Sequence, residues 1–278
     1  MTGRPLLPAW SEPFTGERRA QLARVPPLGA IDREWAWGGA DGSGVRVAIV
    51  DSGVESSHPA VGGRVVVSVR VALVDDEPRV FDDPDGIDAV GHGTACAAIV
   101  HSLAPGAELV SVRVLNPDNR CKGQVFAEGL AWAVGHGATV INLSLSSKSD
   151  ALYATFHELA DEAYFANVLL VCAANNLPGP SYPSLFSSVV SVAAHDLPDP
   201  WTYFYNPRPP VEFGARGLDV PVAWRDGGNS VATGNSFAAP HISGIAALIR
   251  SKHPSVTPFE VKAILAATAN EVRGFRTG

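Results

Sequence analysis

The sequence lacks any long hydrophobic run. No apolar stretch reaches the roughly 20 residues that a membrane-spanning helix needs. The first residues, MTGRPLLPAWSEPFTGERR, contain no apolar core of the kind found in signal peptides. These absences weigh against an integral membrane protein and predict a cytoplasmic chain. No internal repeat or low-complexity block is present either, so we expect one large folded domain.

Cysteine is scarce. The chain has three, Cys96, Cys121 and Cys172, and none forms a CxxC pair. An odd count without that spacing is poor material for a disulfide framework or a cysteine-based metal site. We therefore expect reduced thiols in a reducing compartment.

Basic residues are outnumbered. There are 21 Lys and Arg against 28 Asp and Glu, which gives a net charge of −7. This balance weighs against nucleic acid or an anionic membrane as a partner, since both favour a basic surface. A hydrophobic content of 46% and a charged content of 18% indicate a globular protein.

Short apolar runs rich in β-branched residues alternate with amphipathic segments. The runs are typical of strands buried on both faces of a parallel sheet, and they cover residues 45–50, 108–115, 139–145, 168–173 and 189–193. Helices are predicted over residues 94–102, 124–135, 151–166, 237–252 and 257–269. The last begins with Thr257, Pro258 and Glu260, the pattern of a capping box.

This alternation predicts the fold class α/β, with a doubly wound, mostly parallel sheet and helices on both faces. Residues 1–27 contain prolines and arginines with little periodicity. We expect them to form an irregular N-terminal extension, followed by a domain over residues 28–278.

Three polar residues are expected beyond the carboxyl ends of the strands, where functional side chains lie in such a sheet. Asp51 follows the first strand, although an Asp-Ser-Gly turn can simply end a strand. His92 lies at a helix start, which disfavours a charged imidazole. Ser236 also lies at a helix start, where serine often acts as a cap. Together they offer a nucleophile, a base and a carboxylate that orients the base.

Three segments carry a resemblance to a known family. VAIVDSGVESSHP, GHGTACAAIV and GNSFAAPHISG resemble the signature blocks of the subtilases, in the family's order of Asp, His and Ser. The resemblance covers roughly residues 31–269. It implies a subtilisin-like fold and a serine endopeptidase with Ser236 as nucleophile, His92 as general base and Asp51 orienting that base.

The resemblance also implies an asparagine that donates to the oxyanion. The stretch VCAANN matches the family's usual Ala-Ala-Gly-Asn, so that Asn176 matches the donor and Asn175 replaces a glycine. If that glycine takes a positive φ, asparagine is the best-tolerated substitute. Asn175 stays open as an alternative donor. The backbone N–H of Ser236 would be the second donor.

Substrate binding is expected to add a peptide, or a segment of an unfolded protein, as an extra β-strand. The resemblance implies that one edge of the cleft is formed by Ser144, Leu145 and Ser146. It implies that the primary pocket is walled by Ala173, Ala174 and Asn175. Ser181 matches the base of that pocket, and the bond before Pro183 matches a cis-proline.

No metal and no cofactor are expected. The chain runs from the helix after His92 directly to the next strand, without the calcium-binding loop of many secreted subtilisins. The acidic residues Asp82, Asp83, Asp85 and Asp88 lack ligand spacing and suggest a solvated loop. Cys96 lies one helical turn after His92, which predicts a small buried side chain beneath it.

The residues before the matching region are too few for the folded pro-domain of secreted relatives, so we expect either that none is needed or that it has been deleted. We hypothesise that residues 5–13 lie near the cleft and restrain activity. The sequence thus favours a cytoplasmic endopeptidase, in a narrower version one that removes leader segments from peptides. The alternatives are a transpeptidase or macrocyclase of the same family and a non-catalytic peptide-binding module. The sequence predicts no oligomeric state.

Overall fold

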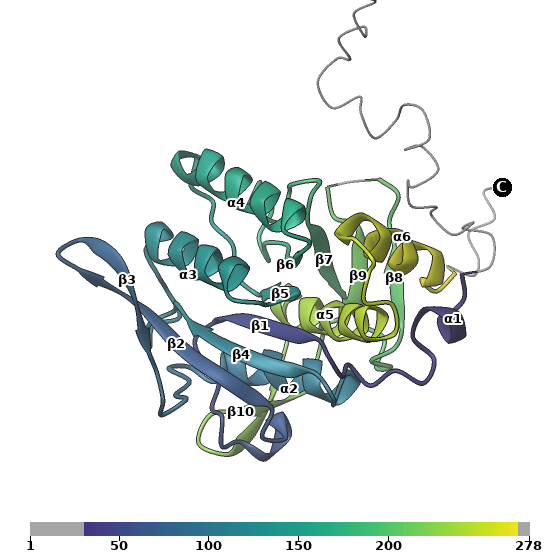
Figure 1. Cartoon of the computed structure of the whole chain (residues 1–278), viewed down its shortest axis with the longest axis horizontal. Helices are drawn as coiled ribbons and strands as arrows, with labels where there is room; N and C mark the ends of the chain where they lie inside the picture. Colours follow the sequence, from purple (N-terminus) through teal and green to yellow (C-terminus); the bar gives the residue numbers. More distant parts are fainter. Residues whose placement is uncertain (1–30, 209, 272–278) are drawn as a thin grey trace, which may run out of the picture. The chain divides into compact units, whose positions relative to one another are not determined.

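The five apolar runs form five adjacent parallel strands in the middle of one sheet. The computed structural model describes residues 31–208 and 210–271. Its main sheet has nine strands in the order β3-β2-β4-β1-β5-β6-β7-β9-β8. The predicted runs are β1 (Arg46–Asp51), β4 (Glu108–Arg113), β5 (Val140–Leu143), β6 (Leu169–Ala173) and β7 (Val190–His195). The prediction of a mostly parallel α/β sheet is therefore confirmed (Figure 1).

The remaining strands were not predicted. The valine-rich residues 65–74 do carry a strand signal, whereas the other segments are shorter or more polar. These strands are β2 (Val65–Val74), β3 (Glu77–Asp82), β8 (Tyr203–Tyr205), β9 (Phe213–Arg216), β10 (Val220–Trp224) and β11 (Gly228–Ala232). β2 and β9 extend the parallel part of the sheet, while β3 and β8 are antiparallel edge strands. β10 and β11 form a separate antiparallel hairpin.

Helices pack on both faces of the sheet (Figure 1). The α-helices are α1 (Arg33–Trp37), α2 (His92–Leu103), α3 (Gly123–Gly135), α4 (Tyr153–Phe165), α5 (Asn235–Lys252) and α6 (Pro258–Thr268). The described residues also contain two short 3₁₀ turns, η4 (Pro59–Val61) and η5 (Asp150–Leu152). α3 and α4 cover one face, and α2 and α5 pack against each other on the opposite face.

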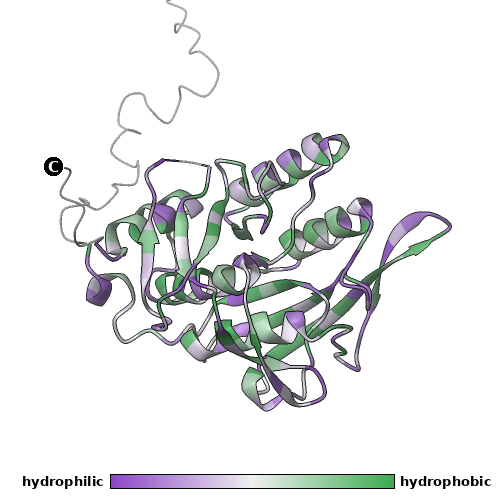
Figure 2. Cartoon of the chain, turned by 180° about the vertical axis from the view of Figure 1, so that it is seen from behind, coloured by the Kyte–Doolittle hydropathy of each residue, from purple (hydrophilic) through white to green (hydrophobic). Residues whose placement is uncertain are grey.

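The core lies between the sheet and these helices. Phe126 of α3 and Phe156 of α4 are buried, and their rings lie 4.7 Å apart. Figure 2 shows that the central strands are mainly hydrophobic, whereas the helices on the surface combine hydrophobic and hydrophilic residues. This is the pattern expected where strands are covered on both faces and helices on one.

Two helices begin two residues earlier than predicted. α2 begins at His92 and α5 begins at Asn235, so His92 and Ser236 are themselves helical residues. The predicted capping box of α6 is confirmed, because Thr257 accepts from the backbone of Glu260 and the Glu260 carboxylate accepts in return. No described helix combines the length and apolar character needed to cross a bilayer. The predicted extension over residues 1–27, and with it the proposed restraint by residues 5–13, lies outside the described residues.

Candidate active site

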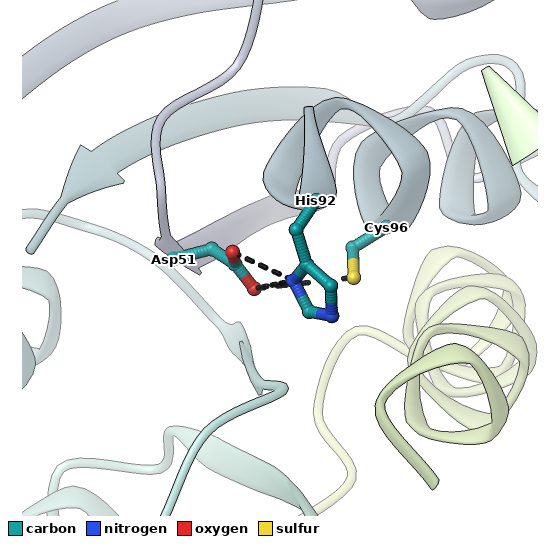
Figure 3. A group of neighbouring side chains, drawn as sticks. All are labelled: Asp51, His92 and Cys96. Atoms are coloured by element: carbon teal, nitrogen blue, oxygen red, sulfur yellow. Dashed lines mark hydrogen bonds and ion pairs between the residues drawn. The ribbon is translucent and has the colours of Figure 1, made fainter. Parts of the chain in front are cut away.

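Asp51 and His92 form a buried pair at the carboxyl edge of the sheet. Asp51 is the last residue of β1 and is fully buried. His92 Nδ1 lies 2.8 Å from Oδ1 and 3.0 Å from Oδ2 of that carboxylate (Figure 3). The backbone N–H of Ser52 also donates to Asp51 Oδ1, at 2.7 Å. Both partners of the pair are thus held in a fixed orientation.

The start of α2 fixes the position of His92. The preceding Gly91 has a φ of 108°, and a Cβ built there would lie 2.7 Å from the indole of Trp224. Glycine is therefore required both by backbone conformation and by space. Trp224 belongs to β10, so the small hairpin supports the start of the helix from the side.

Asp88 caps this helix start from outside. Its Oδ1 accepts hydrogen bonds from the backbone N–H of Gly91 at 2.7 Å and from Ser52 Oγ at 2.7 Å. Its Oδ2 accepts from the backbone N–H of Thr94 at 2.8 Å. An anionic cap at a helix N-terminus satisfies free N–H groups and complements the helix dipole.

The interpretation of the acidic run as a solvated loop is wrong for two of its members. Asp83 and Asp88 are both buried. Asp83 pairs with Arg113, whose Nε and Nη2 donate at 2.9 and 3.0 Å. A carboxylate can be buried only when it has an ionic or hydrogen-bonding partner of this kind. The sequence does not reveal this partner, because Asp83 and Arg113 are brought together by the sheet.

The surroundings of His92 act on its pKa in opposite directions. Burial alone lowers the pKa of the imidazole, while the charge and hydrogen bond of Asp51, with a contribution from Asp88, raise it. The net result is a pKa above the ordinary histidine value. The imidazolium form is therefore stabilised at this position, as a base that accepts a proton during reaction requires.

Ser236 is the second residue of α5, and its neighbours tie that helix to the sheet. Asn235 Nδ2 donates to the carbonyl of Ala174 at 3.0 Å, and its Oδ1 accepts from Ala194 N at 2.8 Å. Asn176 Oδ1 accepts from the backbone N–H of Asn235 at 2.9 Å. The start of α5 is thereby connected to the loop after β6 and to β7.

Ser236 and Asn176 meet around Gly234. A Cβ at Gly234 would lie 3.3 Å from Ser236 Oγ and 3.5 Å from Asn176 Nδ2. A side chain at this position would therefore contact both the hydroxyl and the amide. Asn175 differs, because its Oδ1 accepts locally from Leu177 N at 2.8 Å. Asn175 is not among the described residues with positive φ.

A chain of buried polar groups lies beneath Ser236. Ser144 Oγ donates to the carbonyl of Ser236 at 2.7 Å and accepts from Asn142 Nδ2 at 2.9 Å. Ser243 of α5 donates to Asn142 Oδ1 at 2.9 Å. The Ser144 side chain thus contacts α5, while its neighbours line the cleft. Asn142 and Ser243 were not predicted, because only the packing of α5 on β5 brings them together.

Cys96 is buried in α2 beneath His92, as expected from its spacing (Figure 3). Its Sγ lies 3.4 Å from Ser144 Oγ and 3.5 Å from the carbonyl of Ser236. Asp51, His92 and Cys96 could bring three ligand atoms within 4.8 Å of one another. Burial, together with the charge of Asp51, raises the pKa of the Cys96 thiol well above its ordinary value, which disfavours the thiolate that binds metals. The donor chemistry therefore fits a packed thiol better than a metal ligand.

A cavity of about 460 Å³ joins the predicted residues. It is lined by His92, Ser236 and Asn176 together with Ser144, Leu145, Ser146, Ala173, Ala174 and Asn175. The opposite wall is formed by residues that the sequence did not single out, Leu115, Asn119, Arg120, Cys121, Gly123 and Phe126. The sequence gave no signal for this wall, which comes from the loop after β4 and the start of α3.

Ser181 is placed differently from the other predicted residues. It is buried and does not line this cavity, and its hydroxyl shares a hydrogen bond of 2.8 Å with Ser184 Oγ. The next peptide bond, between Tyr182 and Pro183, is cis, as the resemblance implied. The position of Ser181 at the base of the primary pocket stays a prediction.

Comparison with known proteins agrees with the geometry of the site. The family described as the subtilase family matches residues 42–277. The chain belongs to the subtilase family. It is 31% identical to a thermostable alkaline protease of Halalkalibacterium halodurans, over 82% of this chain and 63% of that protein. It is 32% identical to subtilisin BL of Lederbergia lenta, over 90% of this chain and 91% of that protein.

A solved structure supports the same assignment. A cold-adapted subtilisin-like serine proteinase superposes with a TM-score of 0.68 at 26% identity, over 86% of this chain and 89% of that one. The chain is thus a subtilase with a subtilisin-like fold, and its enzymatic class is that of a serine protease. The family works with an Asp-His-Ser triad, and in this subtilase one residue of each type lies at the carboxyl edge of the sheet.

Proposed function

We propose that this subtilase hydrolyses peptide bonds through an acyl-enzyme on Ser236, with His92 as general base and Asp51 as its orienting carboxylate. The observation that carries the proposal is the buried contact between His92 Nδ1 and Asp51, at 2.8 and 3.0 Å. It fixes the tautomer of the neutral imidazole with its proton on Nδ1. The other ring nitrogen, Nε2, then points away from Asp51 (Figure 3), and His92 and Ser236 line the same cavity.

The reaction follows from this arrangement. Ser236 Oγ attacks the scissile carbonyl while its proton passes to His92 Nε2. The carbonyl oxygen becomes an oxyanion that accepts hydrogen bonds from Asn176 Nδ2 and from the backbone N–H of Ser236. The tetrahedral species collapses, the C–N bond breaks, and His92 returns the proton to the leaving amine. A water molecule then attacks the ester in the same way and releases Ser236.

The anchoring of Asn176 favours it over Asn175 as the amide donor. Its Oδ1 is already held by the Asn235 N–H, which directs Nδ2 toward another acceptor. Among the described residues, Asn176 Nδ2 donates to no protein group. The Asn175 side chain is instead engaged in a local turn with Leu177.

We propose that the substrate is a peptide or an unfolded segment that adds a strand between the two walls of the cleft. Ser144, Leu145 and Ser146 would form one edge, and Ala173, Ala174 and Asn175 would wall the primary pocket. The proposed setting is the cytoplasm, with removal of leader segments from peptides as the native role. The three cysteines are unpaired thiols, which suits a reducing compartment.

Labelling with a fluorophosphonate tests the proposal, because such probes react only with an activated serine. The wild-type chain is expected to be labelled and Ser236→Ala is not. Ser147→Ala is a matched control, since Ser147 lines the same cavity and should leave labelling intact. Absence of labelling in a folded wild-type protein would contradict the catalytic role. Mass spectrometry of peptide products separates hydrolysis from transpeptidation, because a macrocyclase releases cyclised products instead of products that carry a new carboxylate.

A further inference from the structure

A second cavity adjoins the cleft. It has a volume of about 310 Å³ and lies between β2 and the segment that joins β4 to α3. Leu115, Arg120 and Cys121 line both cavities. The second cavity therefore adjoins the proposed substrate cleft at these three residues. We call it the side groove.

The end of β4 creates the side groove. β2 pairs with β4 only as far as Arg70 and Arg113, whereas its pairing with β3 continues to Val74. Beyond Arg70, β2 therefore has a strand neighbour on one side only. The chain after β4 turns back, and five of its residues form the other side of the groove: Asn116, Pro117, Arg120, Cys121 and Lys122. Lys122 and Gln124 contact Asp76 and close the far end.

The charge of the side groove is opposite to that of the chain. The charged residues that line it are all cationic, Arg70, Arg113, Arg120 and Lys122, although the chain carries a net charge of −7. The acidic residues at the tip of the hairpin, including Asp75 and Glu77, do not line the groove. The cleft itself is lined by no carboxylate among the described residues.

Two of these cations are already engaged and two are not. Arg113 holds Asp83 with two hydrogen bonds, and Lys122 lies 3.4 Å from Asp76. Arg70 and Arg120 have no carboxylate partner among the described residues. The Arg70 guanidinium lies over the ring of Phe81 at 4.6 Å, which restrains it without neutralising it. Arg120 is exposed at the junction of the two cavities.

We infer that the side groove binds the carboxylates of an acidic segment of the substrate, on the N-terminal side of the scissile bond. Arg120 contacts the first carboxylate and Arg70 a second one further along. The inference rests on the proposed function for its direction. In the proposed orientation the primary pocket holds the residue whose carbonyl is attacked, and the residues before the scissile bond run from it past Ser146 toward Arg120. Charges in this position select among substrates by complementarity.

Matched peptides measure the preference. They share one cleavage site and carry two Glu, two Gln or two Lys residues among the positions four to seven residues before it. The wild-type enzyme is expected to cleave the Glu peptide with a kcat/KM about fivefold above that of the Gln peptide, as exposed ion pairs allow. Raising the salt concentration from about 0.05 to about 0.5 M should remove most of this preference, because the charges are screened.

Charge reversal locates the site. Arg120→Glu is expected to reverse the order and favour the Lys peptide, while Arg70→Glu should reduce the preference for Glu. Arg79→Glu is the matched control, since Arg79 is exposed on the same hairpin but does not line the groove, and it should keep the wild-type order. Equal kcat/KM for the Glu and Gln peptides, or an unchanged order in Arg120→Glu, would overturn the inference.

Binding to an inactive variant keeps this test separate from the catalytic proposal. Fluorescence anisotropy of labelled peptides with Ser236→Ala should show tighter binding of the Glu peptide than of the Gln peptide, and a loss of that difference in Ser236→Ala with Arg120→Glu. If the wild-type chain cleaves nothing and this difference is still found, the catalytic proposal fails and the proposal for the side groove stands. If both peptides bind equally, the groove proposal fails whatever the catalysis shows.

Discussion

The side-chain oxygen of Asn176 accepts a hydrogen bond from the backbone N–H of Asn235, the residue directly before Ser236, at 2.9 Å. This contact orients an amide from the loop after β6 by means of the helix that carries the proposed nucleophile. The amide nitrogen then lies on the same side of Gly234 as Ser236 Oγ. The geometry makes Asn176 and Ser236 parts of one rigid arrangement.

Replacing Asn176 tests whether this amide stabilises the transition state. Asn176→Ala is expected to lower kcat by about 100- to 1000-fold with little change in KM, because the oxyanion forms only during reaction. Asn175→Ala removes a local turn contact and should lower kcat by less than about tenfold. Steady-state kinetics on one peptide measure both. An equal loss in Asn175→Ala would assign the donor role to Asn175 instead.

The pH dependence of catalysis should report the environment of His92. The base acts in its neutral form, and its pKa is raised above the ordinary value, so kcat/KM should rise with pH through a midpoint above about 6.5. Asp88→Asn removes one negative charge that favours the imidazolium, so the pKa of His92 falls and the midpoint moves to lower pH.

Asp85→Asn is the control for this shift, because Asp85 lies exposed in the same loop. It should leave the midpoint in place. Asparagine at position 88 keeps one acceptor oxygen and can replace only one of the two carboxylate oxygens that accept from Gly91 N and Thr94 N, so circular dichroism should establish that the fold is retained. An unchanged midpoint in a folded Asp88→Asn protein would exclude the electrostatic role of Asp88.

The contact between Gly91 and Trp224 should be visible in stability. Gly91→Ala places a methyl group 2.7 Å from the indole, and we expect a loss of about 1–3 kcal/mol in the free energy of unfolding. Gly179→Ala is a matched control, because Gly179 has a similar φ of +119° but no neighbour within 4 Å. It should lose only the conformational part, about 1–2 kcal/mol.

A double-mutant cycle separates the two causes at Gly91. In the Trp224→Ala background the methyl group has space, so Gly91→Ala should cost less than in the wild type. Denaturant unfolding measures all four proteins. Additive effects of the two substitutions would show that strain of the backbone, and not the indole, sets the requirement for glycine.

His241 should make the protein sensitive to acid. Burial, with smaller contributions from Arg216 and His195, lowers the pKa of this histidine to about 4, although its hydrogen bond to the Phe237 carbonyl acts in the opposite direction. Between pH 6.5 and 4 the unfolded chain therefore binds a proton that the folded chain does not. Stability is complete above pH 6.5 and falls as the pH decreases, by about 3 kcal/mol for this one group.

The His241→Asn variant lacks this titration and retains a donor for the Phe237 carbonyl. Its free energy of unfolding, measured by urea denaturation at several pH values, should fall less steeply with acid than that of the wild type. The difference between the two proteins should change by about 3 kcal/mol from pH 7 to 4. Parallel curves would show that His241 does not titrate separately in the two states.

The sequence by itself determined the parallel centre of the sheet and the three candidate catalytic residues. Apolar β-branched runs define β1, β4, β5, β6 and β7, because strands covered on both faces need no polar residue. Asp51, His92 and Ser236 stand out because their flanking segments form local patterns, a strand end and two helix starts. The family follows from these same segments.

Tertiary structure decided what surrounds them. The burial of Asp83 and Asp88 depends on partners distant in the chain, and so does the contact of Ser144 with α5. The polar residues of β3 carry no clear periodic signal, and the valine-rich run of β2 does not show by itself which strands flank it. The side groove at Arg70 and Arg120 therefore could not be predicted. One hydrogen bond, from Asn235 N to Asn176 Oδ1, favours Asn176 over Asn175 as the donor to the oxyanion. This hydrogen bond exists only because α5 packs against the end of β6.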